Sequence, residues 1–308
     1  MKSTEFAERQ YETTFHLEIG SGGGGPFVPT QPLEMYLGID AATNATNAHR
    51  IWQILKVNIP RRVNLSPVLW PSLPRRYHTA ISGRMVSLFI QFKVPKYNDS
   101  NRAKYRGRFG SPYFEVAITK HQQSRLAELQ RRVQSRAIVR YASPAFWTRA
   151  DFDRIAATRS VLAESAYLIP SRVRSHKKWM YTGPTGPVIL NPDPEEIKSE
   201  TWQTLTELMS RLSREDTLRN HIVELARLIR ETTAAPDFGR ESEWIAELRK
   251  YAKLTREDEE YLFYLRTVVD TAELADTTWV VMFLPDDNIR SQLADFQEDL
   301  AMLWMRYF

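Results

Sequence analysis

Hydrophobic and polar residues alternate along this chain with two different periods, and the change of period divides it. Residues 3–19 have apolar side chains at roughly helical spacing and predict a helix that ends at the glycine-rich run 20–25. Farther along, short apolar runs bounded by turn residues predict strands, and the amphipathic stretches between them predict helices. The predicted strands are 35–41, 88–92, 112–118, 137–147 and 166–170, and the predicted helices that accompany them are 121–136 and 149–165.

The chain from about residue 194 onward has a different pattern, because nearly all of its apolar positions recur at helical spacing. One stretch, 277–287, is apolar enough for either a strand or a buried helix. Residues 43–84 hold several prolines and predict an insertion between two strands. We therefore expect an α/β fold with a mixed sheet flanked by helices in 1–192, an insertion at about 43–84, and an all-α domain in 193–308.

Charge divides the chain at nearly the same place. Residues 1–190 hold 28 Lys and Arg against 12 Asp and Glu, a balance of +16, whereas residues 191–308 hold 14 against 25, a balance of −11. A basic region attracts polyanions, because neutralised phosphates release their counterions. The same asymmetry would also let the two regions attract each other, and the sequence leaves both interpretations open.

Composition excludes several kinds of site. The chain has no cysteine, so disulfides and thiolate metal ligands are impossible. Its 6 histidines are scattered without an i, i+4 pair, which argues against a zinc site. No apolar run is long enough to cross a bilayer and the N-terminus is too polar for a signal peptide, so we expect a cytoplasmic protein without a membrane partner.

Two short polar motifs lie in predicted strands. Asp40 is in "GIDA", within the strand 35–41, and Gln91 and Lys93 are in "LFIQFK", at the end of the strand 88–92. Residues two apart share a face of a strand, so the side chains of Gln91 and Lys93 should point the same way. The plainer alternative is that Asp40 lies in a turn and Lys93 is a solvated residue at the strand end.

Residues 3–147 resemble the PD-(D/E)XK nuclease superfamily, and most closely its Mrr-like restriction endonuclease branch. The resemblance lies in the motifs and in the order of the elements, which is helix, strand with Asp, strand with Gln-x-Lys, helix and strand. The motifs are also similar to those of bacterial proteins associated with phage defence. The resemblance implies a restriction-endonuclease-like fold, a Mg²⁺ or Mn²⁺ cofactor, and hydrolysis of DNA. The chain departs from the pattern in two ways: Gln91 replaces the commoner acidic ligand, and 51 residues separate it from Asp40.

The resemblance gives each motif residue a role. Asp40 and Gln91 would bind the metal ion, which polarises the phosphoryl oxygen. Lys93 would orient or deprotonate the attacking water. A Gln91→Glu change is expected to raise the affinity for Mg²⁺, because it restores an acidic ligand.

A further carboxylate should complete the metal site. Glu8 in the first helix, ahead of Glu5 or Glu12, matches the additional acidic position of the superfamily. Glu34 competes with it, because it lies six residues before Asp40 and would share the face of that residue in a longer strand. The expected catalytic set is Asp40, Gln91, Lys93 and Glu8, and the expected metal ligands are Asp40, Gln91, Glu8 and Glu34.

Basic residues outside the motifs are candidates to contact nucleic acid. The loop 96–108 combines cations with tyrosines, a composition that can follow a phosphate backbone and stack bases, although a solvated loop explains it equally well. The helix 121–136 carries further arginines, and Gln122 and Gln123 at its start match a position where the superfamily often directs a polar residue to the site. The candidates are Arg61, Arg62, Lys96, Lys104, Arg106, Arg108, Arg125, Arg131 and Arg132.

With the resemblance, these features predict a metal-dependent DNA endonuclease of bacterial anti-phage defence. The alternative is a catalytically inactive nuclease fold that binds DNA, or a partner protein through the helical C-terminal domain, within a defence complex. A DNA-binding regulator ranks third, because the sequence has no clear helix-turn-helix signature. The sequence leaves open whether the chain forms a homo-oligomer.

Overall fold

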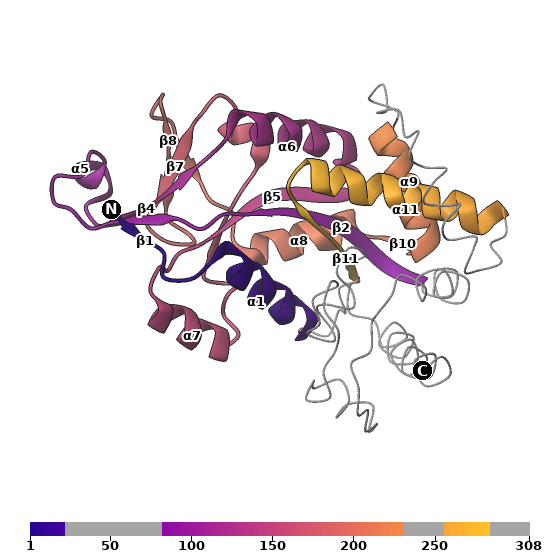
Figure 1. The fold of residues 1–308 in the computed structure, drawn as a ribbon, viewed down its shortest axis with the longest axis horizontal. Coiled ribbons are helices and arrows are strands. Elements are labelled where there is room, and N and C mark those ends of the chain that lie inside the picture. The colour runs from indigo at the N-terminus through magenta and orange to yellow at the C-terminus, as the bar shows by residue number, and fades with distance from the viewer. Residues whose placement is uncertain (22–81, 231–255, 284–308) are drawn as a thin grey trace, which may run out of the picture. The chain divides into compact units, whose positions relative to one another are not determined.

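The computed structural model describes residues 1–21, 82–230 and 256–283 (Figure 1). No helix in these ranges is both long and apolar enough to cross a membrane. The elements are β1 (Lys2–Ser3), α1 (Glu8–Ser21), β2 (Ser82–Phe92), β3 (Lys96–Asn98), α5 (Arg106–Phe109), β4 (Tyr113–Ala117), α6 (Lys120–Val133), β5 (Ala137–Pro144), α7 (Arg149–Ala157), β6 (Ser165–Leu168), the 3₁₀-helix η2 (Pro170–Val173), β7 (Lys178–Tyr181), β8 (Pro187–Asn191), β9 (Glu196–Lys198), α8 (Trp202–Leu212), β10 (Arg214–Thr217), α9 (Leu218–Arg230), α11 (Arg256–Leu274) and β11 (Thr278–Phe283).

The described residues fall into two compact units. The first contains 1–21, 86–213 and 271–280, and it holds the described residues that line the pocket discussed below. The second contains 82–85, 214–230, 256–270 and 281–283, and there β10 pairs antiparallel with the first residues of β2.

Strands of the first unit belong to two sheets. In one sheet the order is β1-β3-β4-β7-β8-β9, and all neighbours are antiparallel. In the other, β2 pairs in parallel with β5, β5 pairs antiparallel with β6, and β11 pairs with β2. The predicted α/β class is therefore confirmed, with two sheets where a single mixed sheet was expected.

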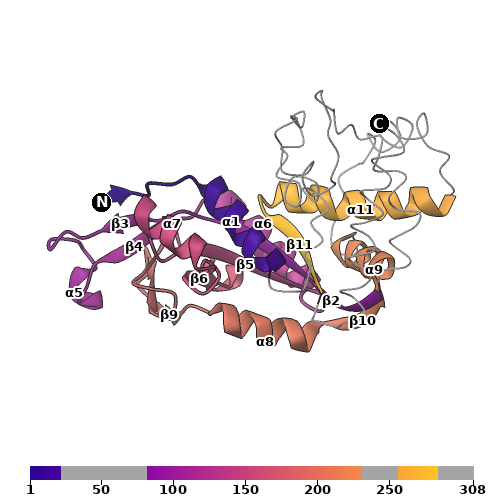
Figure 2. The same cartoon turned by 90° about the horizontal axis from the view of Figure 1, so that it is seen from below.

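The parallel pair of β2 and β5 positions the Gln-x-Lys motif. Gln91 lies opposite Tyr141, and Phe92 lies opposite Ala142. Parallel neighbours need a long crossover, and here residues 93–136, which include α6, supply it. The helices α1 and α6 cover opposite faces of the pair (Figures 1 and 2). Because consecutive strand residues point to opposite faces, Phe92 is directed to α1 and Gln91 is directed to the side of α6.

Aromatic side chains join α1 to β2. The ring of Phe92 lies 5.5 Å from that of Tyr11 and 5.1 Å from that of Phe15, both in edge-on geometry. All three residues are buried. Burial of one such side chain stabilises a fold by about 1.5–3 kcal/mol, so this cluster is sufficient to hold α1 in a fixed position beside the motif.

Helix ends differ from the predicted ones where local backbone geometry decides. The helix predicted over 149–165 ends at Ala157, because Arg159 adopts a left-handed φ of 52°. The helix predicted from residue 194 begins only at Trp202, where the Thr201 hydroxyl accepts a hydrogen bond from the Thr204 N–H at 3.1 Å. The short strands β7 and β8 were not predicted.

Three strands lie in the part predicted to be all-helical, namely β9, β10 and β11. The last of them shows that the described part of the stretch 277–287 is a strand, as its β-branched and aromatic residues favour. The all-α prediction for 193–308 is therefore not confirmed, and residues 193–213 belong to the first unit. Nearly all of the insertion at 43–84 lies outside the described residues, and the domain assignment stays a prediction.

A buried ion pair holds the segment after β9 against β5. Arg140 is 6% exposed, and its guanidinium donates to both carboxylate oxygens of Glu200, with Nη2 3.1 Å from Oε1. The Nη1 group of Arg140 also donates to the Val139 carbonyl at 2.9 Å. Glu200 in turn pairs through its backbone with Tyr167 of β6. These contacts explain why residues that follow the predicted boundary belong to the first unit.

Glu200→Ala should destabilise the protein by about 3–5 kcal/mol, because it leaves the Arg140 charge buried without its partner. The double change Arg140→Met with Glu200→Leu should cost much less, since both charges leave together. Asp153→Ala breaks an exposed pair with Arg149 and should cost at most about 1 kcal/mol. Urea unfolding followed by circular dichroism measures all three. A loss of similar size in the first and third variants would contradict this account.

His16 should make the fold sensitive to acid. It is 2% exposed, it lies against the Phe92 ring, and its Nε2 has no hydrogen-bond partner among the described residues. Burial lowers the pKa of His16 to about 4 from an ordinary value of 6.5. The unfolded chain therefore binds a proton at a higher pH than the folded chain. The free energy of unfolding should have its full value above pH 6.5 and should decrease between pH 6.5 and about 4. The total decrease should be on the order of 3 kcal/mol.

The test is unfolding at a series of pH values for the wild type, His16→Leu and His121→Gln. The first variant should lose most of the acid-dependent decrease, whereas the second, at an exposed histidine, should retain it. If His16→Leu has the same decrease between pH 6.5 and 4 as the wild type, another group is responsible.

Candidate functional site

A pocket of about 300 Å³ lies beside the end of β2 in the first unit. Its walls come from three segments that are far apart in sequence: α1, β2, and the turn between α11 and β11. The Gln-x-Lys motif thus lies where these three segments meet around a pocket. The lining residues are Glu8, Glu12, Ile90, Gln91, Phe92, Asp276, Thr277 and Thr278.

Gln91 and Lys93 both approach Asp276. The Gln91 Nε2 donates to Asp276 Oδ2 at 2.8 Å, and Lys93 Nζ lies 4.0 Å from the same oxygen. This common partner confirms that the two side chains share a face of the strand. Gln91 is 1% exposed, and its Oε1 has no hydrogen-bond partner among the described residues. The side chain of Asp276 is 60% exposed, so its carboxylate contacts both the buried amide of Gln91 and the solvent.

The end of α11 places Asp276. The helix stops at Leu274, and Asp276 has a left-handed φ of 52°. The Thr277 N–H donates to the Ala272 carbonyl at 2.9 Å, which is the six-to-one hydrogen bond of a Schellman turn. Aspartate tolerates this conformation better than most residues other than glycine. Arg125 of α6 donates to the Leu274 carbonyl at 2.6 Å and so links this turn to α6.

The two glutamines at the start of α6 have different partners. Gln122 Nε2 donates to Asp276 Oδ2, so Gln122 belongs to the site as the sequence suggested. Gln123 is buried and acts structurally: its Oε1 accepts from the Tyr141 hydroxyl at 2.7 Å, and its Nε2 donates to the Pro170 carbonyl at 2.5 Å. Asp276 was not predicted from the sequence, because an aspartate two residues after a helix ordinarily marks only the helix end.

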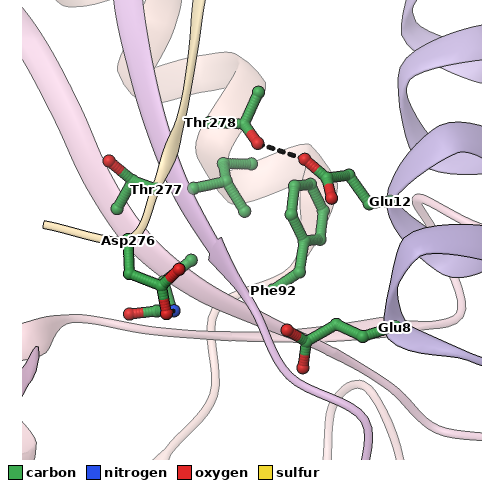
Figure 3. A pocket seen from close by; sticks show the side chains of 8 residues that line it. Glu8, Glu12, Phe92, Asp276, Thr277 and Thr278 are labelled. Atoms are coloured by element: carbon green, nitrogen blue, oxygen red, sulfur yellow. Dashed lines mark hydrogen bonds between the residues drawn. The ribbon is translucent and has the colours of Figure 1, made fainter. Parts of the chain in front are cut away.

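Glu8 and Glu12 reach toward the pocket from α1, with Asp276 across β2 from them (Figure 3). Glu8 Oε2 accepts a hydrogen bond from the Val94 N–H at 3.3 Å, immediately after the motif lysine. Glu12 accepts one from the hydroxyl of Thr278. Both carboxylates are therefore fixed by contacts that also fix the strand ends around the pocket.

Electrostatics couples Glu8 to the motif. Burial raises the pKa of the Glu8 carboxyl, and the positive charge of Lys93 and the Val94 N–H lower it. The negative charges of Asp276 and Glu12 raise it further. The protonation of Glu8 therefore depends on the charges of Lys93, Asp276 and Glu12.

The donor types around the pocket suit a hard cation, because Mg²⁺ prefers carboxylate and amide oxygens. The buried Oε1 of Gln91 is an oxygen that still requires a partner. Within the described ranges, however, no three His, Cys, Asp or Glu side chains are grouped closely enough to hold a metal ion. Asp40 and Glu34 lie outside the described residues, so the predicted metal ligands Asp40, Gln91, Glu8 and Glu34 stay a prediction.

Basic candidates for nucleic-acid contact are found in two places. Lys96 is in β3, and Lys104, Arg106 and Arg108 are in the following loop and α5, which lies far from α6 along the first unit (Figure 1). The Lys104 Nζ lies 5.3 Å from the centre of the adjacent Tyr105 ring, as an ammonium attracted to an aromatic face would.

The candidates on α6 already have partners inside the protein. Arg125 donates to the Leu274 carbonyl, and Arg131 and Arg132 contact Glu128 at 2.7 and 2.8 Å. Arg61 and Arg62 lie outside the described residues. The loop cations are therefore better placed than the helix cations to meet an external phosphate.

No family model matches this chain, and neither a curated protein nor a solved structure matches it.

Proposed function

We propose that the protein is a metal-dependent nuclease that hydrolyses DNA phosphodiester bonds, with the pocket beside β2 as its active site. The observation that carries the proposal is the meeting of Gln91 and Lys93 at the carboxylate of Asp276, beside a pocket that also receives Glu8. An ammonium, a carboxamide with an unpartnered oxygen, and carboxylates are the groups required to hold a cation, orient water and stabilise developing negative charge.

Lys93 is the group that would act on water. Its side chain is only 17% exposed, and Asp276 provides a nearby counter-charge that holds the ammonium beside the pocket. A fixed ammonium in a poorly solvated position stabilises negative charge more strongly than one in open water.

Gln91 and Glu8 would contribute oxygen ligands, together with Asp40 from the predicted neighbouring strand. A bound Mg²⁺ or Mn²⁺ supplies polarisation of the phosphoryl oxygen and a more acidic water. The buried position of Gln91 would exclude bulk water from this side of the pocket, and the Val94 N–H would keep the Glu8 carboxylate at the strand end.

The basic balance of residues 1–190 supports a polyanionic substrate, and the exposed cations of β3 and the following loop support contact with its phosphates. The parallel pair β2–β5, joined through α6, is compatible with a restriction-endonuclease-like core. The likeness of the motifs to those of phage-defence proteins supports a cytoplasmic role in bacterial anti-phage defence, with an acidic C-terminal part available to a partner protein.

A catalytically inactive nuclease fold that binds DNA or a partner protein is the second candidate. It is favoured by the glutamine at position 91 and by the lack of a three-residue metal group within the described ranges. The two candidates differ in metal-dependent cleavage, which only the first predicts.

The wild-type protein should nick supercoiled plasmid DNA in MgCl₂ or MnCl₂, and nicking should stop when EDTA is added. Lys93→Ala should slow nicking about 10²–10⁴-fold, because it removes the group that acts on water. Asp40→Ala should abolish nicking, because it removes a charged metal ligand. Lys198→Ala, at an exposed position in β9, is the matched control and should nick at the wild-type rate. Gel time courses with each metal give the rates.

The outcome of this experiment separates the two candidates. Wild-type protein that retains DNA binding but never nicks in either metal supports the inactive scaffold. Equal nicking rates in wild type and Lys93→Ala would show that the activity does not come from this site.

Binding of duplex DNA should weaken steeply with salt, with a log–log slope of about −0.9 for each phosphate contacted. The triple change Lys96→Gln, Lys104→Gln and Arg108→Gln should make the slope less negative, because these cations are exposed. Arg131→Gln should change the slope less, since Glu128 already neutralises this arginine. Fluorescence anisotropy at several NaCl concentrations measures the slope. An affinity for DNA that does not depend on salt would contradict the proposed phosphate contacts.

A further inference from the structure

The carboxylate of Asp276 is a junction of three site side chains. One of its oxygens accepts hydrogen bonds from the Nε2 groups of Gln91 and Gln122, and Lys93 Nζ lies 4.0 Å from it. These partners come from β2 and α6, whereas Asp276 follows Gln91 by 185 residues along the chain. The connection therefore exists only because the turn after α11 lies beside the end of β2.

This contact fixes which end of the Gln91 carboxamide is available. A carboxamide has a donor end and an acceptor end, and a carboxylate can bind only the donor end. With Nε2 held by Asp276, Oε1 is left without a partner among the described residues, in a side chain that is 1% exposed. Buried polar atoms are nearly always hydrogen-bonded, so an exception next to a pocket indicates a ligand.

We propose that Asp276 is a positioning residue of this site: it orients the Gln91 carboxamide so that its oxygen can bind a divalent cation, and it holds Lys93 beside that oxygen. The inference rests on the proposed nuclease function and adds to it a residue from outside the motif region. Asp276 acts through Gln91 and Lys93 and need not touch the substrate.

The proposal also explains why position 91 has glutamine. A glutamate there would have no hydrogen to donate to Asp276 and would place a buried carboxylate directly beside the carboxylate of Asp276. The sequence alone led to the expectation that Gln91→Glu raises Mg²⁺ affinity. With Asp276 in place we expect this variant to bind Mn²⁺ more weakly than the wild type, and the second change Asp276→Asn should restore binding by reversing donor and acceptor.

Glycine is the substitution that tests Asp276 most cleanly. Its φ of 52° lies in the left-handed region, where glycine is the most favourable residue, so Asp276→Gly removes the carboxylate without straining the turn. Asp276→Asn retains an oxygen that can accept the hydrogen bonds. Arg159→Gly is the matched control, because this exposed residue also has a φ of 52° at the end of α7, away from the pocket.

The first measurement is NMR of the ¹⁵N-labelled full-length chain, in which Gln91→Met identifies the side-chain amide signals of Gln91 by their loss. Asp276→Gly should shift these signals and speed their exchange with water, whereas Asp276→Asn and Arg159→Gly should preserve slow exchange. Unchanged signals in Asp276→Gly would overturn the proposal. If that variant does not fold, Asp276→Ala takes its place with the same expected outcomes.

The second measurement is calorimetric titration of the same variants with MnCl₂. Asp276→Gly should raise the Kd about 10–100-fold, the usual effect of removing a residue that orients a metal ligand. Asp276→Asn should stay within a few-fold of the wild type, and so should Arg159→Gly. A Kd that is unchanged in Asp276→Gly, or raised equally in Asp276→Asn, would contradict the positioning role.

The two proposals fail in different ways. If the wild type neither binds Mn²⁺ nor nicks DNA, the nuclease function is wrong, and the Gln91 amide signals alone decide whether Asp276 orients this side chain. If the wild type binds Mn²⁺ and nicks DNA but Asp276→Gly equals it in both respects, the nuclease function stands and the role of Asp276 is wrong.

Discussion

The parallel pairing of β2 with β5 is the constraint on which the rest of the first unit depends. Parallel neighbours cannot be joined by a tight turn, so the chain must leave the end of β2 and return through α6 before β5 begins. This crossover places the start of α6 next to the end of β2. Gln122 thereby comes close to Gln91, although neither strand nor helix alone would bring them together.

The same pairing places polar side chains in the interior, and each of them requires a partner. Tyr141, opposite Gln91, donates its hydroxyl hydrogen to Gln123. Arg140, one position earlier on β5, is neutralised by Glu200. Because unpaired polar groups are costly in the interior, these contacts hold α6 and the segment after β9 in fixed positions. The Oε1 of Gln91 differs from these groups, since it is one of the few buried side-chain atoms without a hydrogen-bond partner among the described residues.

The site combines groups whose properties depend on one another. Lys93 lowers the pKa of Glu8 while burial and Asp276 raise it, so a change at any of these residues alters the charge balance at the others. That interdependence is the physical reason to treat α1, the motif strand and the turn after α11 as parts of one site.

How much of this could be predicted from the sequence differs from residue to residue. The period of two in β2 was enough to place Gln91 and Lys93 on one face, and the helical spacing was enough to predict α1 and α6, because these features depend on neighbouring residues alone. The end of α7 at Ala157 and the start of α8 at Trp202 were predicted less well, since a single left-handed residue decides the first and a hydroxyl cap decides the second.

Partners from distant segments could not be predicted at all. Nothing near Asp276 in the sequence distinguishes it from an ordinary residue at a helix end, and its contact with Gln91 follows only from the Schellman turn that directs it to β2. The pairing of Arg140 with Glu200 is of the same kind. The sequence by itself determined which face of each element is polar or apolar, because that depends on local spacing. Only the tertiary structure decided which polar groups meet, because burial and the cost of an unpaired charge act on whatever the folded chain brings together.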